Sequence, residues 1–518
     1  MRIERTKNAS RNITFGILLK IIQIVIPFLL RSAMTYFIGF QYLGLNSLFT
    51  SVLQVLNLAE LGVGSAMVYS MYKPIVDDDT KSICALMKMY RLYYRVIGLI
   101  VLLSGLILLP FLPKLIKGNV PADINIYVLY LLNLSATVLS YWLFAYKNSL
   151  LQAHQRTDIT SKVMLITNMF QYVLQFLVLW LFKNYYLYVI VMLFTQALTN
   201  IITAIIVSKM FPNYNPEGKL EKEEIKKLNG RIRDLFTSKI GSVIVNSADT
   251  IVVSAFLGLT MLAIYQNYYF IISAIISFIT IGFNACTAGI GNSLIVETQE
   301  KNFNDLKKFT FLISWIAGVC SCCCLCVFQP FMKIWMGDDK LLPYNAVICF
   351  VIYFFVYEIN SLLNTYKDAG GIWKEDRLRP LTTALTNLCM NLIMVQFWGI
   401  YGVLLSTVIS TLIVGMPWLF YNLFHTLFKP KFFIEYMKKL LIYFIVTILV
   451  CAVSAFICIS IPFNGVKNMV VCIFVSLFIS NVAFFLCYRK TKEFYEGIVL
   501  IDSITKGKLR LSERLFKN

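Results

Sequence analysis

The residues that decide the fold run from Ile13 to Phe40 and read ITFGILLKIIQIVIPFLLRSAMTYFIGF. This apolar run is long enough to cross a bilayer as a helix, which takes about 20 mostly apolar residues. It carries Arg31 near its middle and Lys20 closer to its start. A charged side chain at bilayer depth costs about 2.5–3.5 kcal/mol even on lenient insertion scales, so it normally faces a wet cavity or a partner charge.

A second copy of this helix lies in the later half of the chain, from Lys239 to Gly258, and reads KIGSVIVNSADTIVVSAFLG. Asp249 stands in it at almost the same depth as Arg31. Further matched pairs recur at the same spacing, to within one position: Leu61-Gly62 with Ile281-Gly282, Tyr146-Lys147 with Tyr366-Lys367, and Thr167-Asn168 with Thr386-Asn387. We therefore predict two related halves of the same orientation, whose first helices face each other across a polar cavity.

The composition is typical of a protein that crosses the membrane many times. Of 518 residues, 58% are hydrophobic and 14% are charged, and the mean hydropathy is +0.71. Fourteen apolar runs have spanning length, one of them at 380–398, and no alternating pattern indicates a β-barrel. We expect an all-α fold of about 14 transmembrane helices. Two parallel six-helix bundles would be followed by two C-terminal helices.

The predicted domain organisation has four parts. They are an N-terminal six-helix bundle at 1–208, a cytoplasmic amphipathic linker at 209–234, a C-terminal six-helix bundle at 235–430, and helices 13 and 14 with a basic cytoplasmic tail at 431–518. With the N-terminus inside, 39 of the 47 Lys and Arg residues fall on the cytoplasmic side. This asymmetry follows the positive-inside rule and places both termini in the cytoplasm. The net charge of +20 is therefore a signal of topology and an attraction to anionic lipid, and not a sign of nucleic-acid binding.

The cysteines and the first helix favour structural interpretations. The 13 cysteines lie mostly in apolar runs, five of them between Cys320 and Cys326. We expect them to pack as small apolar side chains, without a disulfide framework or a metal site. Because Arg31 interrupts the first apolar run and no A-x-A site follows, we expect a signal anchor and no cleaved signal peptide.

Three acidic residues in spanning segments are candidates for coupling to H⁺ or Na⁺, namely Glu60, Asp249 and Glu358. For Glu60 an ion pair with a basic group such as Arg31 is an equal alternative.

Three glycines are candidates for a hinge or gate: Gly62 and Gly64 in the second helix and Gly282 in the eighth. The simpler interpretation of these glycines is close helix packing.

The basic residues near the expected cavity suit an anionic ligand. Arg31 and Lys20 lie in the first helix, and Lys239 or Arg95 would lie near its inner mouth, with Asp249 opposite. A guanidinium binds phosphate through two parallel charge-assisted hydrogen bonds, and phosphate on a lipid is the natural ligand of a basic membrane cavity. The intramembrane acids keep a cationic-drug exporter as the alternative.

Enzymatic classes are disfavoured by what the chain lacks. The sequence has no G-x-x-x-x-G-K-[ST] motif, so we expect no ATP hydrolysis and no nucleotide cofactor. The expected outer loops are short and nearly uncharged, whereas a membrane polymerase would need a sizeable acid-bearing loop. We therefore expect a transporter and not an enzyme.

Five segments in order resemble one family, the bacterial polysaccharide-biosynthesis flippases of the MOP exporter superfamily, over about residues 8–490. They are Phe37 to Leu48 (FIGFQYLGLNSL), Leu58 to Pro74 (LAELGVGSAMVYSMYKP), Ser247 to Gly258 (SADTIVVSAFLG), Gly289 to Glu297 (GIGNSLIVE) and Tyr366 to Pro380 (YKDAGGIWKEDRLRP). The resemblance implies a V-shaped, MATE-like transporter with a central cavity. Similar flippases carry basic residues on the first helix of each bundle; Arg31 matches this pattern, and Asp249 departs from it.

The resemblance also implies a function. Such a protein would flip undecaprenyl-pyrophosphate-linked oligosaccharide repeat units from the inner to the outer leaflet of the bacterial plasma membrane, for capsule, exopolysaccharide or O-antigen biosynthesis. Its partners would be membrane lipids and the polymerase and glycosyltransferases of the same pathway. The alternatives are a MATE-type multidrug or metabolite antiporter, a lipid II flippase, and a polymerase or ligase. No local motif encodes the sugar.

Overall fold

The computed structural model describes residues 5–504, and every regular element among them is a helix. Helices satisfy their own backbone groups, as a chain in lipid requires. Within the described residues, 12 helices are long and apolar enough to cross a membrane, or 13 if the bent pair Ile126–Trp142 and Ala145–Ala153 counts as one span. This confirms the all-α membrane fold, although the count falls below the 14 predicted.

The predicted run at 380–398 explains the difference in count. It forms the helix α13 (Arg379–Trp398), but this helix does not qualify as a span by length and composition. Its buried face carries the amides of Asn387 and Asn391, which lower its hydropathy.

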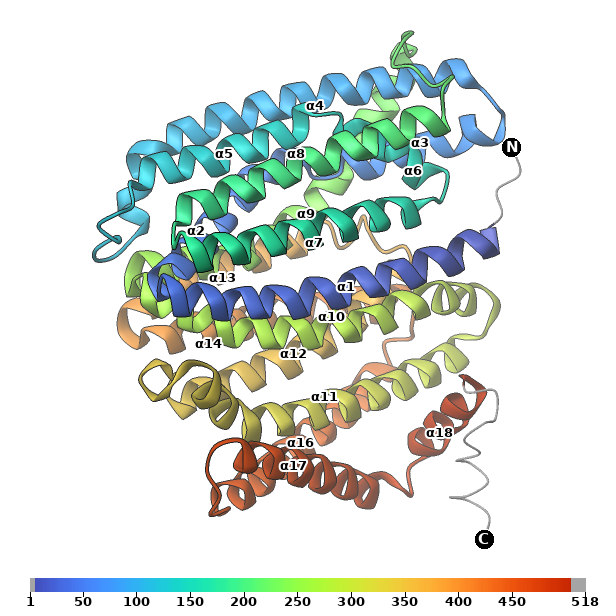
Figure 1. The fold of residues 1–518 in the computed structure, drawn as a ribbon. Helices are drawn as coiled ribbons and strands as arrows, with labels where there is room; N and C mark the ends of the chain where they lie inside the picture. The colour runs from blue at the N-terminus through green and yellow to red at the C-terminus, as the bar shows by residue number, and fades with distance from the viewer. Residues whose placement is uncertain (1–4, 505–518) are drawn as a thin grey trace. The chain divides into compact units, whose positions relative to one another are not determined.

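The helices group into two compact units, Met1–Gln266 and Asn267–Asn518. The first unit contains α1 (Arg5–Phe37), α2 (Phe40–Leu56), η1 (Asn57–Glu60), α3 (Val63–Val76), α4 (Thr80–Leu108), η2 (Leu109–Leu115), α5 (Ile126–Trp142), η3 (Ala145–Lys147), α6 (Asn148–Ala153), α7 (Thr157–Leu181), α8 (Tyr185–Met210), α9 (Lys222–Leu257) and the start of α10 (Leu259–Val296). Within it α1 packs against α7, α7 against α8, and α5 against both α4 and α8, while α2 and α3 pack against α9 (Figure 1).

The second unit is built around one long helix, α11 (Gln299–Met336), which packs against α12, α16, α17 and α18. The unit holds the rest of α10, then α11, η4 (Asp338–Lys340), α12 (Tyr344–Ala369), α13, α14 (Ile400–Ser410), η5 (Thr411–Gly415), α15 (Met416–Thr426), α16 (Phe432–Ile459), α17 (Gly465–Tyr488) and α18 (Lys492–Ile504). Helix α13 packs on α14, and α12 on α14 and α15.

The internal repeat is visible in the backbone where the first helix of each half ends. Gly39 follows α1 with φ 110° and ψ 170°, and Gly258 follows α9 with φ 89° and ψ 172°. These glycines occupy equivalent positions of the two sequence repeats, and only glycine adopts this backbone region without strain. At Gly258 a Cβ atom would also lie 2.9 Å from the carbonyl oxygen of Lys117.

The second predicted helix is interrupted in the structure. Helix α2 ends at Leu56, and α3 begins after Gly62, whose φ of +87° is left-handed. A Cβ atom on Gly62 would lie 2.7 Å from the Cβ of Leu235 and 2.9 Å from the carbonyl oxygen of Ile232, both on α9. Gly62 therefore combines a break in the helix with close packing against α9.

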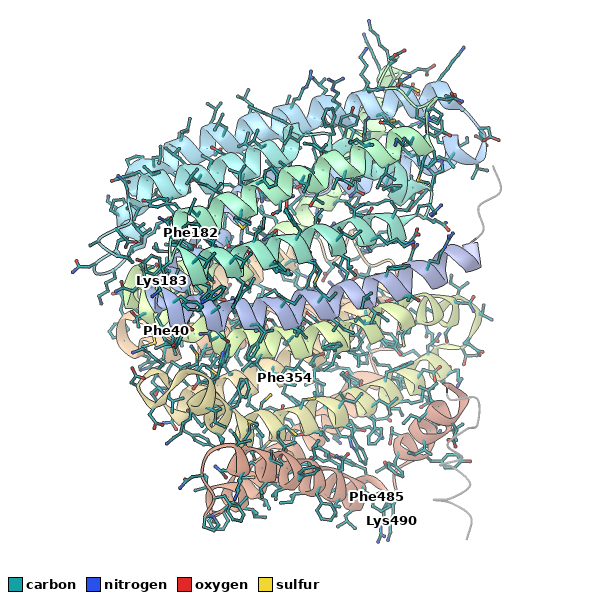
Figure 2. All side chains as sticks on the ribbon, viewed as in Figure 1. Phe40, Phe182, Lys183, Phe354, Phe485 and Lys490 are labelled. Carbon is teal, nitrogen blue, oxygen red and sulfur yellow. The ribbon has the colours of Figure 1, made fainter. Side chains whose placement is uncertain are left out.

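The apolar surface of the helices is that of a membrane protein. Phe182, at the C-terminal end of α7, is 63% exposed, whereas Phe354 is fully buried within the second unit (Figure 2). Large apolar side chains are exposed along most of the spanning helices, as lipid contact allows and water would not.

The cysteines pack inside the second unit. Those at 326, 458 and 472 form one apolar cluster joining α11, α16 and α17, and the sulfurs of Cys322 and Cys451 lie 3.3 Å apart. Of the 13 cysteines, only Cys389 and Cys487 are exposed.

The linker and the tail each contribute a helix. The linker becomes helical at Lys222 and continues without a break into the span of α9. Leu228, in this first part of α9, is buried. In the C-terminal tail, α18 docks on α11 through Phe494, whose ring stacks on Trp315 with a centroid distance of 5.7 Å. The predicted tail beyond it, 505–518, lies outside the described residues.

Candidate substrate and coupling sites

Arg31 lies six residues before the end of α1, or about 9 Å at the helical rise, and so lies nearer the predicted outer end than the middle of the helix. Its side chain is half-buried and lies near Tyr188 on α8. Tyr188 in turn stacks on Tyr185, with ring centroids 5.9 Å apart. Arg31 therefore belongs to an aromatic, partly polar environment inside the first unit.

A ladder of polar side chains runs between α7 and α8 and ends at Tyr188. Thr195 Oγ1 donates to Gln171 Oε1 at 2.9 Å, Gln171 Nε2 reaches Gln175 Oε1 at 3.4 Å, and Gln175 Nε2 reaches the carbonyl oxygen of Tyr188 at 3.4 Å. Polar groups buried in a membrane protein are costly unless satisfied in this way, so the ladder marks the interior of the bundle.

The second unit also buries a row of polar side chains, between α13 and α14. It includes Asn387, the counterpart of Asn168 in the repeated Thr-Asn pair, and Asn391 one turn further along α13. Asn387 Nδ2 donates to Thr407 Oγ1 at 2.9 Å, and Ser406 Oγ donates to Asn391 Oδ1 at 2.6 Å. The two halves thus share a polar seam between two helices as well as the helix order.

The other predicted anion-binding residues are spread over the first unit. Lys20 is half-buried on α1, and Arg95 is exposed on α4. Lys239 on α9 is exposed and donates to Ser65 Oγ at 3.4 Å, while Asp249 on the same helix is half-buried. None of the ion pairs observed between described residues joins Lys20 or Arg95 to an acid.

Glu60 lies at the break between α2 and α3 and is held by tyrosines. Tyr94 on α4 donates to Oε1 at 2.6 Å and Tyr141 on α5 donates to Oε2 at 2.9 Å. Tyr90 donates in turn to the Tyr94 hydroxyl at 2.7 Å. Among the described residues the carboxylate of Glu60 is thus held by phenols, and no ion pair joins it to Arg31. A proton or cation arriving at Glu60 would compete with these hydrogen bonds.

Glu358 on α12 is the opposite case. Its side chain is 0% exposed, and neither carboxylate oxygen has a hydrogen-bond partner among the described residues. Its titratable neighbours include Cys320 on α11 and Tyr357. A buried carboxylate without a partner is costly as an anion, so this position requires a bound proton or a cation to offset the cost.

Each unit also buries an acid against arginine at the end of its polar helix pair. In the first unit Asp158, at the start of α7, accepts from Arg156 Nε at 2.9 Å. In the second unit Asp376, just before α13, accepts from Arg379 Nε at 2.6 Å. The two pairs are not exact repeats, because Arg156 precedes its acid along the chain and Arg379 follows its acid.

Two of these features had no clear signal in the sequence. The tyrosines around Glu60 come from positions 34 and 81 residues away, so only the packing of α4 and α5 brings them together. The one signal in the sequence for a polar cluster here is the pair Tyr90 and Tyr94, which lie one helical turn apart on an apolar helix. Similarly, the segment 366–380 has the composition of an exposed loop, yet it buries Asp376 and Arg379.

The fold was compared with solved structures. A lipid II flippase, MurJ, in an inward-closed conformation, has a TM-score of 0.65 at 14% identity over 92% of this chain and 99% of that chain. An inward-facing multidrug-resistance MATE transporter of the MOP superfamily has a TM-score of 0.59 at 13% identity over 80% and 98%. A MATE transporter of Vibrio cholerae has a TM-score of 0.54 at 13% identity over 80% and 96%. No curated protein sequence matches the chain.

These likenesses and the polar seams within apolar bundles define a multi-pass membrane protein with the fold of the MOP-superfamily transporters. The family model described as "Polysaccharide biosynthesis protein" matches residues 9–286, more than half of the chain. The chain therefore belongs to the polysaccharide biosynthesis protein family, as its sequence motifs predicted.

Proposed function

We propose that the protein is a flippase that moves undecaprenyl-pyrophosphate-linked oligosaccharide repeat units from the inner to the outer leaflet of the bacterial plasma membrane. The observation that carries this proposal is the family match over residues 9–286 on a chain with the fold of a lipid II flippase. Both point to a lipid-linked substrate. The products would serve capsule, exopolysaccharide or O-antigen biosynthesis, and the pathway's polymerase and glycosyltransferases would be partners.

The proposed mechanism is alternating access without chemical catalysis or ATP hydrolysis. Arg31 would hold the pyrophosphate, because a guanidinium makes bidentate charge-assisted hydrogen bonds to phosphate oxygens. Lys20, Lys239 and Arg95 would attract it, and Asp249 would limit how tightly it is held.

Coupling to a proton or sodium gradient is proposed for Glu60 and Glu358. The buried carboxylate of Glu358 needs a positive partner. At Glu60, a bound ion would replace the hydrogen bonds that the tyrosine hydroxyls donate to the carboxylate. Each site lies within one unit. Binding of the ion would therefore act first on the packing of that unit.

The test is leaflet exchange in proteoliposomes that contain a fluorescent undecaprenyl-pyrophosphate oligosaccharide. We expect Arg31→Ala to abolish exchange and Arg31→Lys to retain part of it, because lysine keeps the charge but not the fork of donors. Tyr36→Ala is the matched control, since this side chain lies five residues further along α1 and is 84% exposed. Exchange by Arg31→Ala at the wild-type rate would remove the proposed phosphate site.

A MATE-type drug antiporter is the second candidate, favoured by the unpartnered acid Glu358 and by the MATE-like fold. It predicts uptake of a lipophilic cation such as ethidium into the same proteoliposomes, and no exchange of the lipid-linked sugar.

A further inference from the structure

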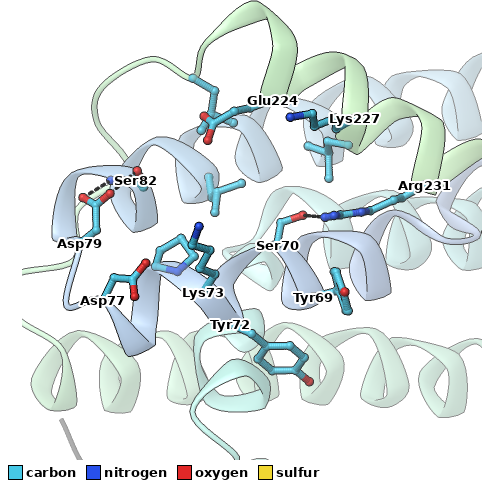
Figure 3. A pocket seen from close by; sticks show the side chains of 14 residues that line it. Tyr69, Ser70, Tyr72, Lys73, Asp77, Asp79, Ser82, Glu224, Lys227 and Arg231 are labelled. Atoms are coloured by element: carbon cyan, nitrogen blue, oxygen red, sulfur yellow. Dashed lines mark hydrogen bonds between the residues drawn. The ribbon is translucent and has the colours of Figure 1, made fainter.

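A pocket of about 640 Å³ opens at the predicted cytoplasmic end of the first unit, between α3, the start of α4 and the start of α9 (Figure 3). This volume lies within the usual range for small-molecule sites, about 300–1,000 Å³. All its lining residues belong to the first unit, and none of them belongs to the substrate or coupling sites proposed above.

Three cationic side chains line this pocket. Lys73 comes from α3, and Lys227 and Arg231 come from one face of α9, four residues apart. Arg231 Nη1 donates to Ser70 Oγ at 3.1 Å, and its guanidinium lies 4.6 Å from the ring centroid of Tyr69. Arg231 is thus oriented by two contacts while most of its donors stay available.

Three carboxylates line the same pocket. Figure 3 shows Asp77 and Asp79 at the turn between α3 and α4, with Lys73 beside Asp77, Glu224 on α9, and Arg231 at the opposite side. Asp79 caps α4 by accepting from the backbone nitrogen and the hydroxyl of Ser82 at 3.1 and 2.6 Å, and these hydrogen bonds hold its pKa below the usual range. Asp77 and Glu224 make no side-chain hydrogen bond or ion pair within the described chain.

The cationic and acidic side chains of this pocket are therefore matched in number but not paired with one another. Neither Lys73 nor Lys227 forms an ion pair with a described acid, although all six charged groups line one cavity. A purely anionic ligand would meet three carboxylates, and a purely cationic one would meet three bases. A ligand that carries both charges finds a partner for each of them in this pocket.

The pocket also lies where lipid headgroups lie. Tyr69 and Tyr72 are exposed on the last turns of a spanning helix, as aromatic residues are at a membrane–water interface, and Val76 beside them is exposed. Acyl chains could follow this surface while the headgroup enters the pocket.

We propose that this pocket binds the headgroup of a zwitterionic phospholipid carrying a primary ammonium, of the phosphatidylethanolamine type. The phosphodiester contacts Arg231, Lys227 and Lys73, and the ammonium donates its three hydrogens towards Asp77 and Glu224. A quaternary ammonium has no hydrogens to donate, and an anionic glycerol headgroup has no positive charge for the acids. Because the site bridges α3 and α9, a bound lipid of this class would hold these two helices together.

Native mass spectrometry of the purified full-length protein tests this proposal, with dioleoyl-phosphatidylethanolamine, -phosphatidylcholine and -phosphatidylglycerol added at equal concentrations. We expect the wild type to retain phosphatidylethanolamine in preference to the other two. Arg231→Ala should weaken this binding about tenfold, as loss of a charge-assisted contact does. Arg233→Ala is the matched control, because Arg233 lies two residues away on α9, is 79% exposed and does not line the pocket.

The double variant Asp77→Asn, Glu224→Gln tests which lipid the pocket prefers. Both side chains are exposed, so the substitutions should leave the fold intact. It should lose the preference for phosphatidylethanolamine and gain affinity for phosphatidylglycerol. Equal binding of all three lipids by the wild type, stronger binding of phosphatidylglycerol, or equal losses in Arg231→Ala and Arg233→Ala would each overturn the proposal. Lipid retention is measured without transport, so these outcomes do not bear on the proposed flippase activity.

Discussion

Arg379 holds the carboxylate of Asp376 with two parallel hydrogen bonds, from Nε to Oδ1 at 2.6 Å and from Nη2 to Oδ2 at 2.8 Å. Both side chains are buried, and Asn364 and Asn422 complete the network at 2.7 and 3.0 Å. A fork-to-fork pair of this geometry fixes the start of α13 relative to α12 and α15.

Breaking this pair should destabilise the second unit. Asp376→Asn would leave Arg379 charged and buried beside an amide, and we expect a loss of about 3–5 kcal/mol in the free energy of unfolding. Thermal unfolding of the purified protein in detergent measures the effect. The neighbouring Arg377→Ala should change little, because Arg377 is exposed in the same segment. Equal melting temperatures for both variants would show that the buried pair adds no stability.

Substitution of Glu358 should affect the stability of the protein and its transport activity differently. Glu358→Gln removes a buried carboxylate that has no partner, so we expect stability to stay unchanged or to rise by about 1–3 kcal/mol. The same variant should lose any dependence of flipping on a proton or sodium gradient, because glutamine cannot exchange either ion. Glu496→Gln, on α18, is the control. Gradient-driven flipping by Glu358→Gln at the wild-type level would exclude this residue from coupling.

The tyrosines around Glu60 should contribute unequally to the free energy of unfolding. Tyr94→Phe and Tyr141→Phe each remove a hydrogen bond to the carboxylate, and we expect each to cost about 1.5–3 kcal/mol. Tyr90→Phe removes only the bond to the Tyr94 hydroxyl and should cost about 0.5–1.5 kcal/mol. Combining each change with Glu60→Gln in a double-mutant cycle isolates the pairwise energy. A coupling near zero for Tyr94 would contradict the observed contact.

The three glycines proposed as hinges should respond to alanine in a fixed order. Gly62→Ala would force a left-handed residue, at about 1–2 kcal/mol, and would push a methyl group into the backbone of α9. Gly64→Ala keeps an ordinary backbone conformation and meets the hydroxyls of Tyr90 and Tyr94, at 3.0 and 4.0 Å, so it should cost less. Gly282→Ala has open space and should stabilise its helix by up to about 1 kcal/mol. Melting temperatures in any other order would argue against the packing seen at Gly62.

Much of the fold could be predicted from the sequence, because spanning helices need long apolar runs whatever their neighbours. Apolar periodicity also located the amphipathic start of α9, where Leu228 is buried. It could not show how α13 buries the amides of Asn387 and Asn391, since their partners Thr407 and Ser406 lie on another helix.

For the candidate coupling site, the sequence indicated the acidic residues but not their hydrogen-bond partners. Charge in an apolar run correctly singled out Glu60 and Glu358 as unusual, because burying an acid is costly anywhere in a bilayer. Which of them has partners depends on how helices distant in sequence pack together. Glu60 meets two phenols and Glu358 meets none, and neither sequence neighbourhood distinguishes the two cases.

The burial of the cysteines has a practical consequence for watching the transporter work. Replacing Cys389 and Cys487 by serine would remove the two exposed thiols and leave the packed ones in place. New cysteines at Tyr36 and Ile295, which are 84% and 86% exposed in different units, could then carry nitroxide labels. Pulsed electron paramagnetic resonance on that pair would record the separation of the two units directly, with and without a lipid-linked sugar.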